Sequence, residues 1–194
     1  NKTENAREHK TMKRFFIITI ISLWSSWINA QSSEGIYSLF TQLNECLTRQ
    51  DYNKGLAILK SNKRSLPKDA IDSFYSVFSI AKYWKGEKIN TDSCIHSVYR
   101  ILDELPKSKE LVLEDPQTNA TYFIIFSNFL SKIDEKGAIT AYHSMKTIWP
   151  TINDDIKNIY LPVLENCIKA SIELRQWDET IPLLEETQDL HDNG

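Results

Sequence analysis

Cysteine and histidine are the side chains of this sequence that could hold a metal ion or supply a nucleophile. Cys94 and His96 are separated by one residue, whereas Cys46, His143 and Cys167 stand alone. A structural zinc site needs two pairs of ligands at set spacings, and the sequence offers one pair. We therefore expect no metal site. We also expect free, buried thiols, because one of three cysteines is left over if any two of them pair.

The other patterns that could carry catalysis are weak. Nucleophilic catalysis needs a serine or cysteine beside a histidine and a carboxylate. His96 and His143 fall on amphipathic segments next to polar residues, as expected for surface positions. The glycines after residue 30 are isolated, so they make no phosphate-binding loop. The acidic pairs at 154–155 and 185–186 are typical of charges at a helix N-terminus or on a solvated helix face. We expect no catalytic residue, no cofactor and no enzymatic activity.

The N-terminal 30 residues are typical of an export signal. The first methionine, Met12, is followed by two basic residues and by an apolar run from Phe15 to Leu23, and the small residue Ala30 follows a polar patch. This order predicts a secretory signal peptide at residues 12–30, cleaved after Ala30. The apolar run is shorter than the ~20 residues of a spanning helix, so an uncleaved membrane anchor is the weaker alternative. Residues 1–11 form an upstream polar extension, and the helical pattern that runs up to the last residues predicts a truncated C-terminus.

Residues 31–194 are expected to fold as helices. Apolar residues recur at spacings of three and four, and no segment shows the sustained alternation of a β-strand. The clearest stripe consists of Tyr122, Phe126, Phe129 and Leu130, which we expect in the core and not in a ligand pocket. The spacing predicts about eight helices, with apolar stripes within 36–47, 56–59, 74–81, 98–102, 122–130, 139–148, 159–172 and 181–184.

These helices are expected to repeat as pairs. Pro67, Pro106 and Pro150 lie 39 and 44 residues apart. Because proline cannot continue a helix, each is expected to end the second helix of a unit. Gly55 and Ala138 place small residues in two of these second helices, where a close helix crossing would need them. One hairpin cannot bury its apolar face alone, so the hairpins should stack and share a core.

This rhythm resembles the tetratricopeptide repeat, a helix-turn-helix unit of ~34 residues. When the units are aligned on the closing proline, the family's small position in the second helix is taken by Gly55 and Ala138. The family's bulky position is taken by Leu59 and Tyr142. In the last unit Thr180 replaces the small residue. The resemblance covers most of residues 34–187, although the family's first-helix Trp, Gly and Tyr pattern is mostly missing. A solenoid of longer two-helix repeats is the close alternative. Either way the expected fold is all-α, an α-solenoid of about four antiparallel helix hairpins.

The resemblance also implies a binding surface. In tetratricopeptide proteins the first helices of successive units line a concave groove that holds extended or helical peptides. The positions of this chain that correspond to the groove are Tyr37, Phe40, Asn44, Phe123, Ser127, Glu165 and Lys169.

Charge and resemblance together indicate a function class. Residues 1–30 carry a net charge of +3, so the other 164 residues carry −6. An acidic chain argues against nucleic acid or an anionic membrane as a partner and favours a basic one. The chain resembles the extracytoplasmic tetratricopeptide regions of Gram-negative bacteria, which implies an exported, periplasmic module that binds a protein or peptide as the sensor region of a larger signalling protein. Two alternatives stay open: a free-standing periplasmic scaffold or assembly factor, and the repeat region of a larger enzyme such as a caspase-like peptidase.

Overall fold

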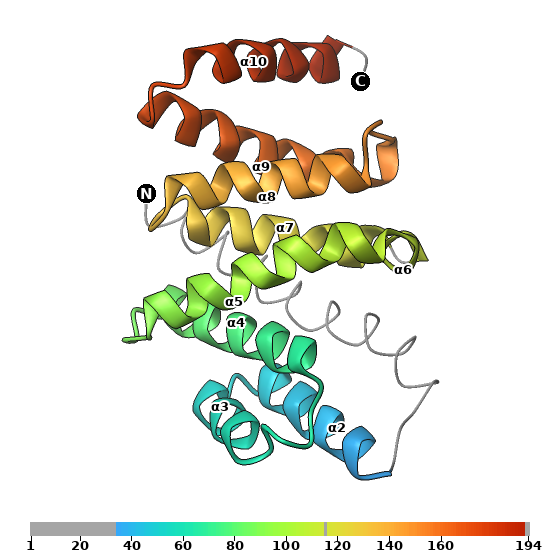
Figure 1. Cartoon of the computed structure of the whole chain (residues 1–194), viewed down its shortest axis with the longest axis vertical. Coiled ribbons are helices and arrows are strands. Elements are labelled where there is room, and N and C mark those ends of the chain that lie inside the picture. The colour runs from blue at the N-terminus through green and yellow to red at the C-terminus, as the bar shows by residue number, and fades with distance from the viewer. Residues whose placement is uncertain (1–33, 115, 193–194) are drawn as a thin grey trace. The chain divides into compact units, whose positions relative to one another are not determined.

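The computed structural model describes residues 34–114 and 116–192, and this part of the chain is all-α (Figure 1). Its helices pack mostly against their neighbours in sequence. In chain order they are α2 (Glu34–Thr48), α3 (Tyr52–Ser61), α4 (Lys68–Trp84), α5 (Thr91–Glu104), the 3₁₀ helix η1 (Leu105–Ser108), α6 (Lys109–Glu114), α7 (Pro116–Leu130), α8 (Glu135–Ile148), α9 (Asp154–Glu173) and α10 (Trp177–Asp192). Each of the eight expected stripes lies within one α-helix, so the all-α prediction is confirmed. The short elements η1 and α6 were not expected.

The chain forms two compact units, which meet in sequence between Ile101 and Leu102. None of the described helices is long and apolar enough to cross a membrane. The expected signal peptide at 12–30 and the polar extension at 1–11 lie outside the described residues, so both stay predictions.

Unit 1 is organised around a row of aromatic rings. The ring of Phe74 lies 5.9 Å from that of Phe40 and 6.0 Å from that of Phe78, and the ring of Tyr52 lies 6.3 Å from that of Phe78. These contacts place α4 against both α2 and α3. Gly55 of α3 is buried at this crossing, where an added Cβ atom would lie only 2.3 Å from Phe78 Cζ. The sequence therefore correctly predicted that a small residue is needed here.

Unit 2 is built on mutual packing of α7, α8 and α9, with α10 packed on α9. The expected core stripe of α7 is confirmed, because Tyr122, Phe126, Phe129 and Leu130 are all fully or almost fully buried. Ala138, the second predicted small residue, is also fully buried in α8.

Two hairpin turns share one backbone geometry. Gln50, between α2 and α3, and Arg175, between α9 and α10, have φ angles of 59° and 57°. In both turns the N–H of that residue donates to the carbonyl three positions back at 3.0 Å, and the next N–H donates five positions back at 2.8 Å. This is the Schellman arrangement, which satisfies the last carbonyls of a helix and turns the chain sharply.

The predicted roles of proline are partly wrong. Pro106 and Pro150 do follow the ends of α5 and α8. Pro67, however, directly precedes α4, six residues after α3 has ended at Ser61, because its fixed φ suits the start of a helix. Pro162 and Pro182 lie inside α9 and α10 without ending them.

Candidate functional site

Three of the seven predicted groove residues are buried and must be corrected. Phe40 packs its ring against Phe74, and Phe123 packs edge-on against Trp149 at 6.0 Å. Ser127 is fully buried and accepts a hydrogen bond of 3.2 Å from the Asn166 amide. These side chains lie on the faces by which α2 and α7 pack within their own units, so they cannot line an accessible groove.

The other four groove candidates are at least partly open to solvent. Tyr37 is 58% exposed and Asn44 is partly exposed, both on α2. Glu165 and Lys169 are exposed one helical turn apart on α9. The structure therefore leaves one candidate pair in each unit.

The cysteines are inert in their surroundings. Cys46, Cys94 and Cys167 are buried free thiols, as predicted. Burial raises the pKa of Cys94 and of Cys167 to about 12 in each case, so the nucleophilic thiolate is scarce at neutral pH. Cys94 is buried while His96 is exposed, so this pair does not converge on one point. Within 34–114 and 116–192 no three His, Cys, Asp or Glu side chains are grouped so that they could hold a metal ion.

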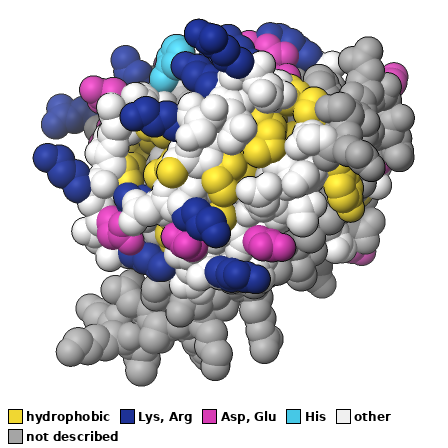
Figure 2. Space-filling view, turned by 90° about the horizontal axis from the view of Figure 1, so that it is seen from below, with side chains coloured by type: hydrophobic (Ala, Val, Ile, Leu, Met, Phe, Trp, Pro, Cys, Tyr) yellow, Lys and Arg dark blue, Asp and Glu magenta, His cyan; other side chains and the backbone are white. Residues whose placement is uncertain are grey.

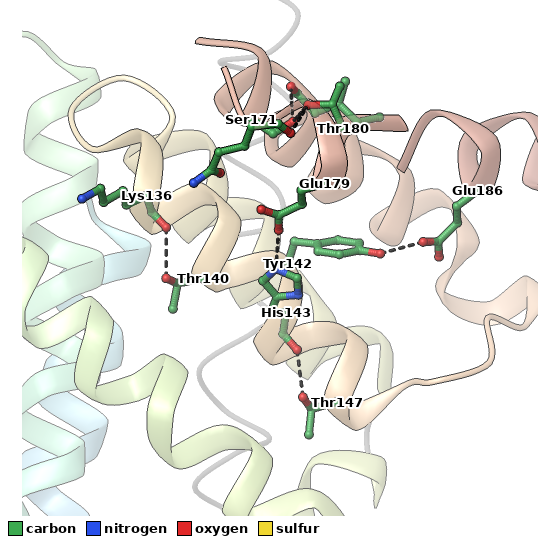
Figure 3. A network of polar contacts seen from close by, with 11 residues as sticks. Lys136, Thr140, Tyr142, His143, Thr147, Ser171, Glu179, Thr180 and Glu186 are labelled. Atoms are coloured by element: carbon green, nitrogen blue, oxygen red, sulfur yellow. Dashed lines mark hydrogen bonds and ion pairs between the residues drawn. The ribbon is translucent and has the colours of Figure 1, made fainter. Parts of the chain in front are cut away.

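A polar cluster around Glu186 joins α10 to α8 and α9, and Figure 3 shows its contact between Tyr142 and Glu186. The Glu186 carboxylate accepts hydrogen bonds of 2.6 Å from the Tyr142 hydroxyl of α8 and 2.6 Å from the Tyr160 hydroxyl of α9. It also forms an ion pair with Lys146 of α8. The expectation of a solvated acidic pair at 185–186 is therefore wrong for Glu186, which is partly buried, and right for Glu185, which is exposed.

The protonation states in this cluster suit an anchor. Burial raises the pKa of Glu186, but the hydrogen bonds from Lys146, Tyr142 and Tyr160 outweigh that effect and the net shift is downward. Burial and the neighbouring carboxylate raise the pKa of both tyrosines. At neutral pH the carboxylate is thus charged and both phenols keep their protons. The charge-assisted hydrogen bonds to this carboxylate fix α10 in place.

Two further polar contacts hold the same side of α10. His143 Nε2 lies 2.7 Å from Glu179 Oε1, and the Thr180 hydroxyl donates to Ser171 Oγ at 2.8 Å (Figure 3). Thr180, at the position where the resemblance described above predicted a small residue, is almost completely buried. The hydroxyls of Thr140 and Thr147, in contrast, bond back to carbonyls of α8 itself and do not contribute to this docking.

The opposite side of α10 carries apolar residues that are exposed. Trp177, Ile181 and Leu184 are 54%, 57% and 50% exposed, and their spacing of four and three residues places them in one row. We call these three residues the α10 stripe. Leu183 is the one apolar residue of α10 in the buried core, so α10 buries Leu183 together with polar side chains and leaves the α10 stripe exposed.

The sequence predicted an apolar helical stripe within 181–184, but it did not include Trp177 and did not indicate that Ile181 and Leu184 are exposed. The spacing of Ile181 and Leu184 shows that they share a face, yet it carries no information on which face docks. That is decided by the partners of Glu179, Thr180 and Glu186, which lie as far as 44 residues away in sequence.

Comparisons of this chain with protein-family models, with curated proteins and with solved structures give no match to any of them.

Proposed function

We propose that this chain is an exported module of tetratricopeptide-like helix hairpins that binds another protein or a peptide and performs no chemistry of its own. The observation that carries the proposal is the α10 stripe. Three large apolar side chains in a row remain exposed on a helix that docks through the buried Leu183 and through polar contacts. Exposed apolar rows on stable proteins mark interaction surfaces.

The repeated hairpin turns support the repeat character of the module. Gln50 and Arg175 occupy the same place in two turns of identical hydrogen bonding, and each turn joins a longer helix to a following one. Aligning these two residues also aligns Gly55 with Thr180, which is the correspondence that the resemblance implies. Stacked hairpins of this kind typically serve as binding scaffolds.

The charge of the two units supports a partner with both apolar and charged contacts. Residues 34–101 hold ten Lys and Arg against seven Asp and Glu, a net charge of +3, whereas residues 102–194 hold eight against 17, a net charge of −9. Figure 2 shows Lys and Arg side chains, with Asp and Glu side chains among them, around a strip of hydrophobic ones. Such opposed charge favours electrostatic steering of a partner.

Selection from a random peptide display library on the immobilised full chain tests binding. We expect enriched peptides that compete with one another for the folded chain and that lose binding when the chain is unfolded in urea. Failure to enrich any peptide that discriminates folded from unfolded chain would refute the binding function.

Export is tested separately. We propose a periplasmic location and a sensor role within a larger signalling protein, on the basis of the predicted signal at 12–30 and the resemblance. Mature protein isolated from a periplasmic fraction should begin at Gln31. A membrane-bound species that retains Met12 would support the uncleaved anchor instead.

A further inference from the structure

We propose that unit 2 encloses a buried water molecule where α6 meets α7, and that this water bridges the Asn119 side-chain oxygen, the Val112 carbonyl and the Tyr122 hydroxyl. The inference is independent of the proposed binding function, because it assigns a site in the interior of the unit. It is derived from two buried polar atoms to which the described residues make no hydrogen bond.

Asn119, near the start of α7, uses only half of its amide group. Its Nδ2 donates to the Val112 carbonyl of α6 at 2.9 Å, whereas no group of the described residues donates to its Oδ1. Exchanging the two amide atoms would not help, since a carbonyl oxygen only accepts hydrogen bonds and so requires the nitrogen. Asn119 is 2% exposed, so bulk solvent does not reach this oxygen. A buried acceptor without a donor is costly, and nearly all such atoms in folded proteins have a partner.

Tyr122 supplies a second buried polar atom about one turn further along α7. Its side chain is 1% exposed, and its hydroxyl also makes no hydrogen bond to the described residues. Burial raises the pKa of Tyr122, so the phenol keeps its proton and can donate it to an acceptor. Residues three apart share one face of a helix, and long side chains on a helix point toward its N-terminus. Helix geometry therefore directs the Tyr122 side chain toward Asn119.

The Val112 carbonyl adds a third polar atom at the same place. α6 spans only Lys109–Glu114, and Val112 is among its last four residues, whose carbonyls have no partner within the helix. A carbonyl oxygen has two lone pairs, so the hydrogen bond from Asn119 leaves it able to accept another. Because Nδ2 and Oδ1 belong to one amide group, the bond to Val112 also holds the Asn119 Oδ1 next to this carbonyl.

Water matches these three atoms in number and in kind. Two of them accept hydrogen bonds and one donates, while a water molecule has two hydrogens and two lone pairs. It can donate to the Asn119 Oδ1 and to the Val112 carbonyl and accept from the Tyr122 hydroxyl, and buried waters typically make about three such bonds. A Ca²⁺ or Mg²⁺ ion fits less well, since three neutral oxygens are fewer than the about six ligands that these ions take.

The first test asks whether the Tyr122 hydroxyl has a partner. Tyr122→Phe should lower the Tm of the full chain, followed by circular dichroism, by about 2–4 °C, because the hydrogen bond to water is lost. A hydroxyl without any partner would have the opposite effect, since its removal relieves an unfavourable burial. Tyr37→Phe removes an exposed hydroxyl and is the matched control, for which we expect an unchanged Tm. An unchanged or raised Tm in Tyr122→Phe would overturn the proposal.

The second test asks whether Asn119 shares that partner. Asn119→Leu is a substitution of similar size that removes the acceptor on which the water depends. The Tyr122 hydroxyl then loses its bridge, so adding Tyr122→Phe to this variant should no longer lower the Tm. An equal loss of Tm in the wild-type and Asn119→Leu backgrounds would show that the two groups are independent, which contradicts a shared water. Circular dichroism establishes that Asn119→Leu is folded, and the first test does not require this variant.

The third test detects the water itself. Relaxation dispersion of ¹⁷O in solutions of the full chain counts the water molecules that stay bound while the protein tumbles. The wild type should hold one more of them than the folded double variant Asn119→Leu with Tyr122→Phe. Equal counts would overturn the water bridge, and together with a lowered Tm in Tyr122→Phe they would assign the hydroxyl to a direct bond with another protein group.

Discussion

Replacing Gly55 by alanine is the sharpest available test of the packing in unit 1. An alanine Cβ would lie 2.3 Å from Phe78 Cζ and 2.6 and 2.7 Å from the two Cε atoms. Ordinary contact between such atoms begins near 3.4 Å, so the ring would have to retreat by about 1 Å. Phe78 is fully buried between the rings of Tyr52 and Phe74, which leaves it no room to move.

The magnitude follows from two opposing effects. Overpacking of a buried site costs about 1–3 kcal/mol of unfolding free energy. Alanine regains about 1 kcal/mol over glycine inside a helix, so Gly55→Ala should destabilise the protein by up to about 2 kcal/mol. Gly35→Ala in α2 is the matched control, because a Cβ atom there meets no atom within 4 Å. That variant should be neutral or up to about 1 kcal/mol more stable.

Thermal unfolding followed by circular dichroism measures both variants. For a chain of this length about 1 kcal/mol corresponds to a shift in Tm of about 2–4 °C, so Gly55→Ala should melt several degrees below Gly35→Ala. Phe78→Leu removes the Cζ and Cε atoms, and in that background Gly55→Ala should no longer be costly. If Gly55→Ala is as stable as Gly35→Ala, or if Phe78→Leu does not relieve its cost, the contact is not as tight as described.

Three further predictions concern single sites. Glu186→Gln should lower stability by about 1–3 kcal/mol at neutral pH, measured by urea unfolding, because it takes the charge out of a partly buried hydrogen-bonded cluster. Folding lowers the pKa of Glu186, so the stability that its carboxylate contributes is present above the unfolded pKa and is lost as the pH falls through the folded pKa. The loss of stability in acid should therefore be smaller in Glu186→Gln than in wild type. Identical dependence of stability on pH in the two proteins would refute this reasoning. Cys94 and Cys167 should react with iodoacetamide at pH 8 at least about 100-fold more slowly in the native chain than in urea, as mass spectrometry would show, and comparable rates would contradict their burial. Gly86→Ala should cost about 1–2 kcal/mol, because Gly86 has a φ of 76° that alanine adopts only with strain, and an unchanged Tm would disprove that role.

The helices could be predicted from the sequence because a helix that buries a stripe needs apolar residues at spacings of three and four. That rule located α2 and α7 without any knowledge of their neighbours. It missed α6, whose six residues are too few to show a period. The need for a small residue at Gly55 was also predictable, whereas its contact, the ring of Phe78, lies on the next helix and leaves no trace in the local pattern.

The candidate binding surface was less predictable than the fold. Alignment to the tetratricopeptide pattern predicted that Phe40 and Phe123 line a groove. Both side chains are instead buried in the cores of their own units, because burying a large apolar side chain is favourable. The α10 stripe escaped prediction for the opposite reason. A row of apolar residues ordinarily indicates the buried face, and only the long-range partners of Glu186 reveal that α10 docks by its other side.

The polar docking of α10 gives the chain an uneven distribution of stability. Apolar contacts hold α3 in place from two sides, whereas α10 combines the buried Leu183 with the polar contacts of Glu179, Thr180 and Glu186. The contacts of the two carboxylates lose strength with added salt and acid, whereas apolar packing and the hydrogen bond between the Thr180 and Ser171 hydroxyls do not. Amide protons of α10 should therefore exchange with solvent through a local opening that leaves α7 to α9 folded. A partner that binds the exposed face of α10 would oppose this local opening. Amide protons along the whole of α10 should therefore exchange more slowly in the complex than in the free chain.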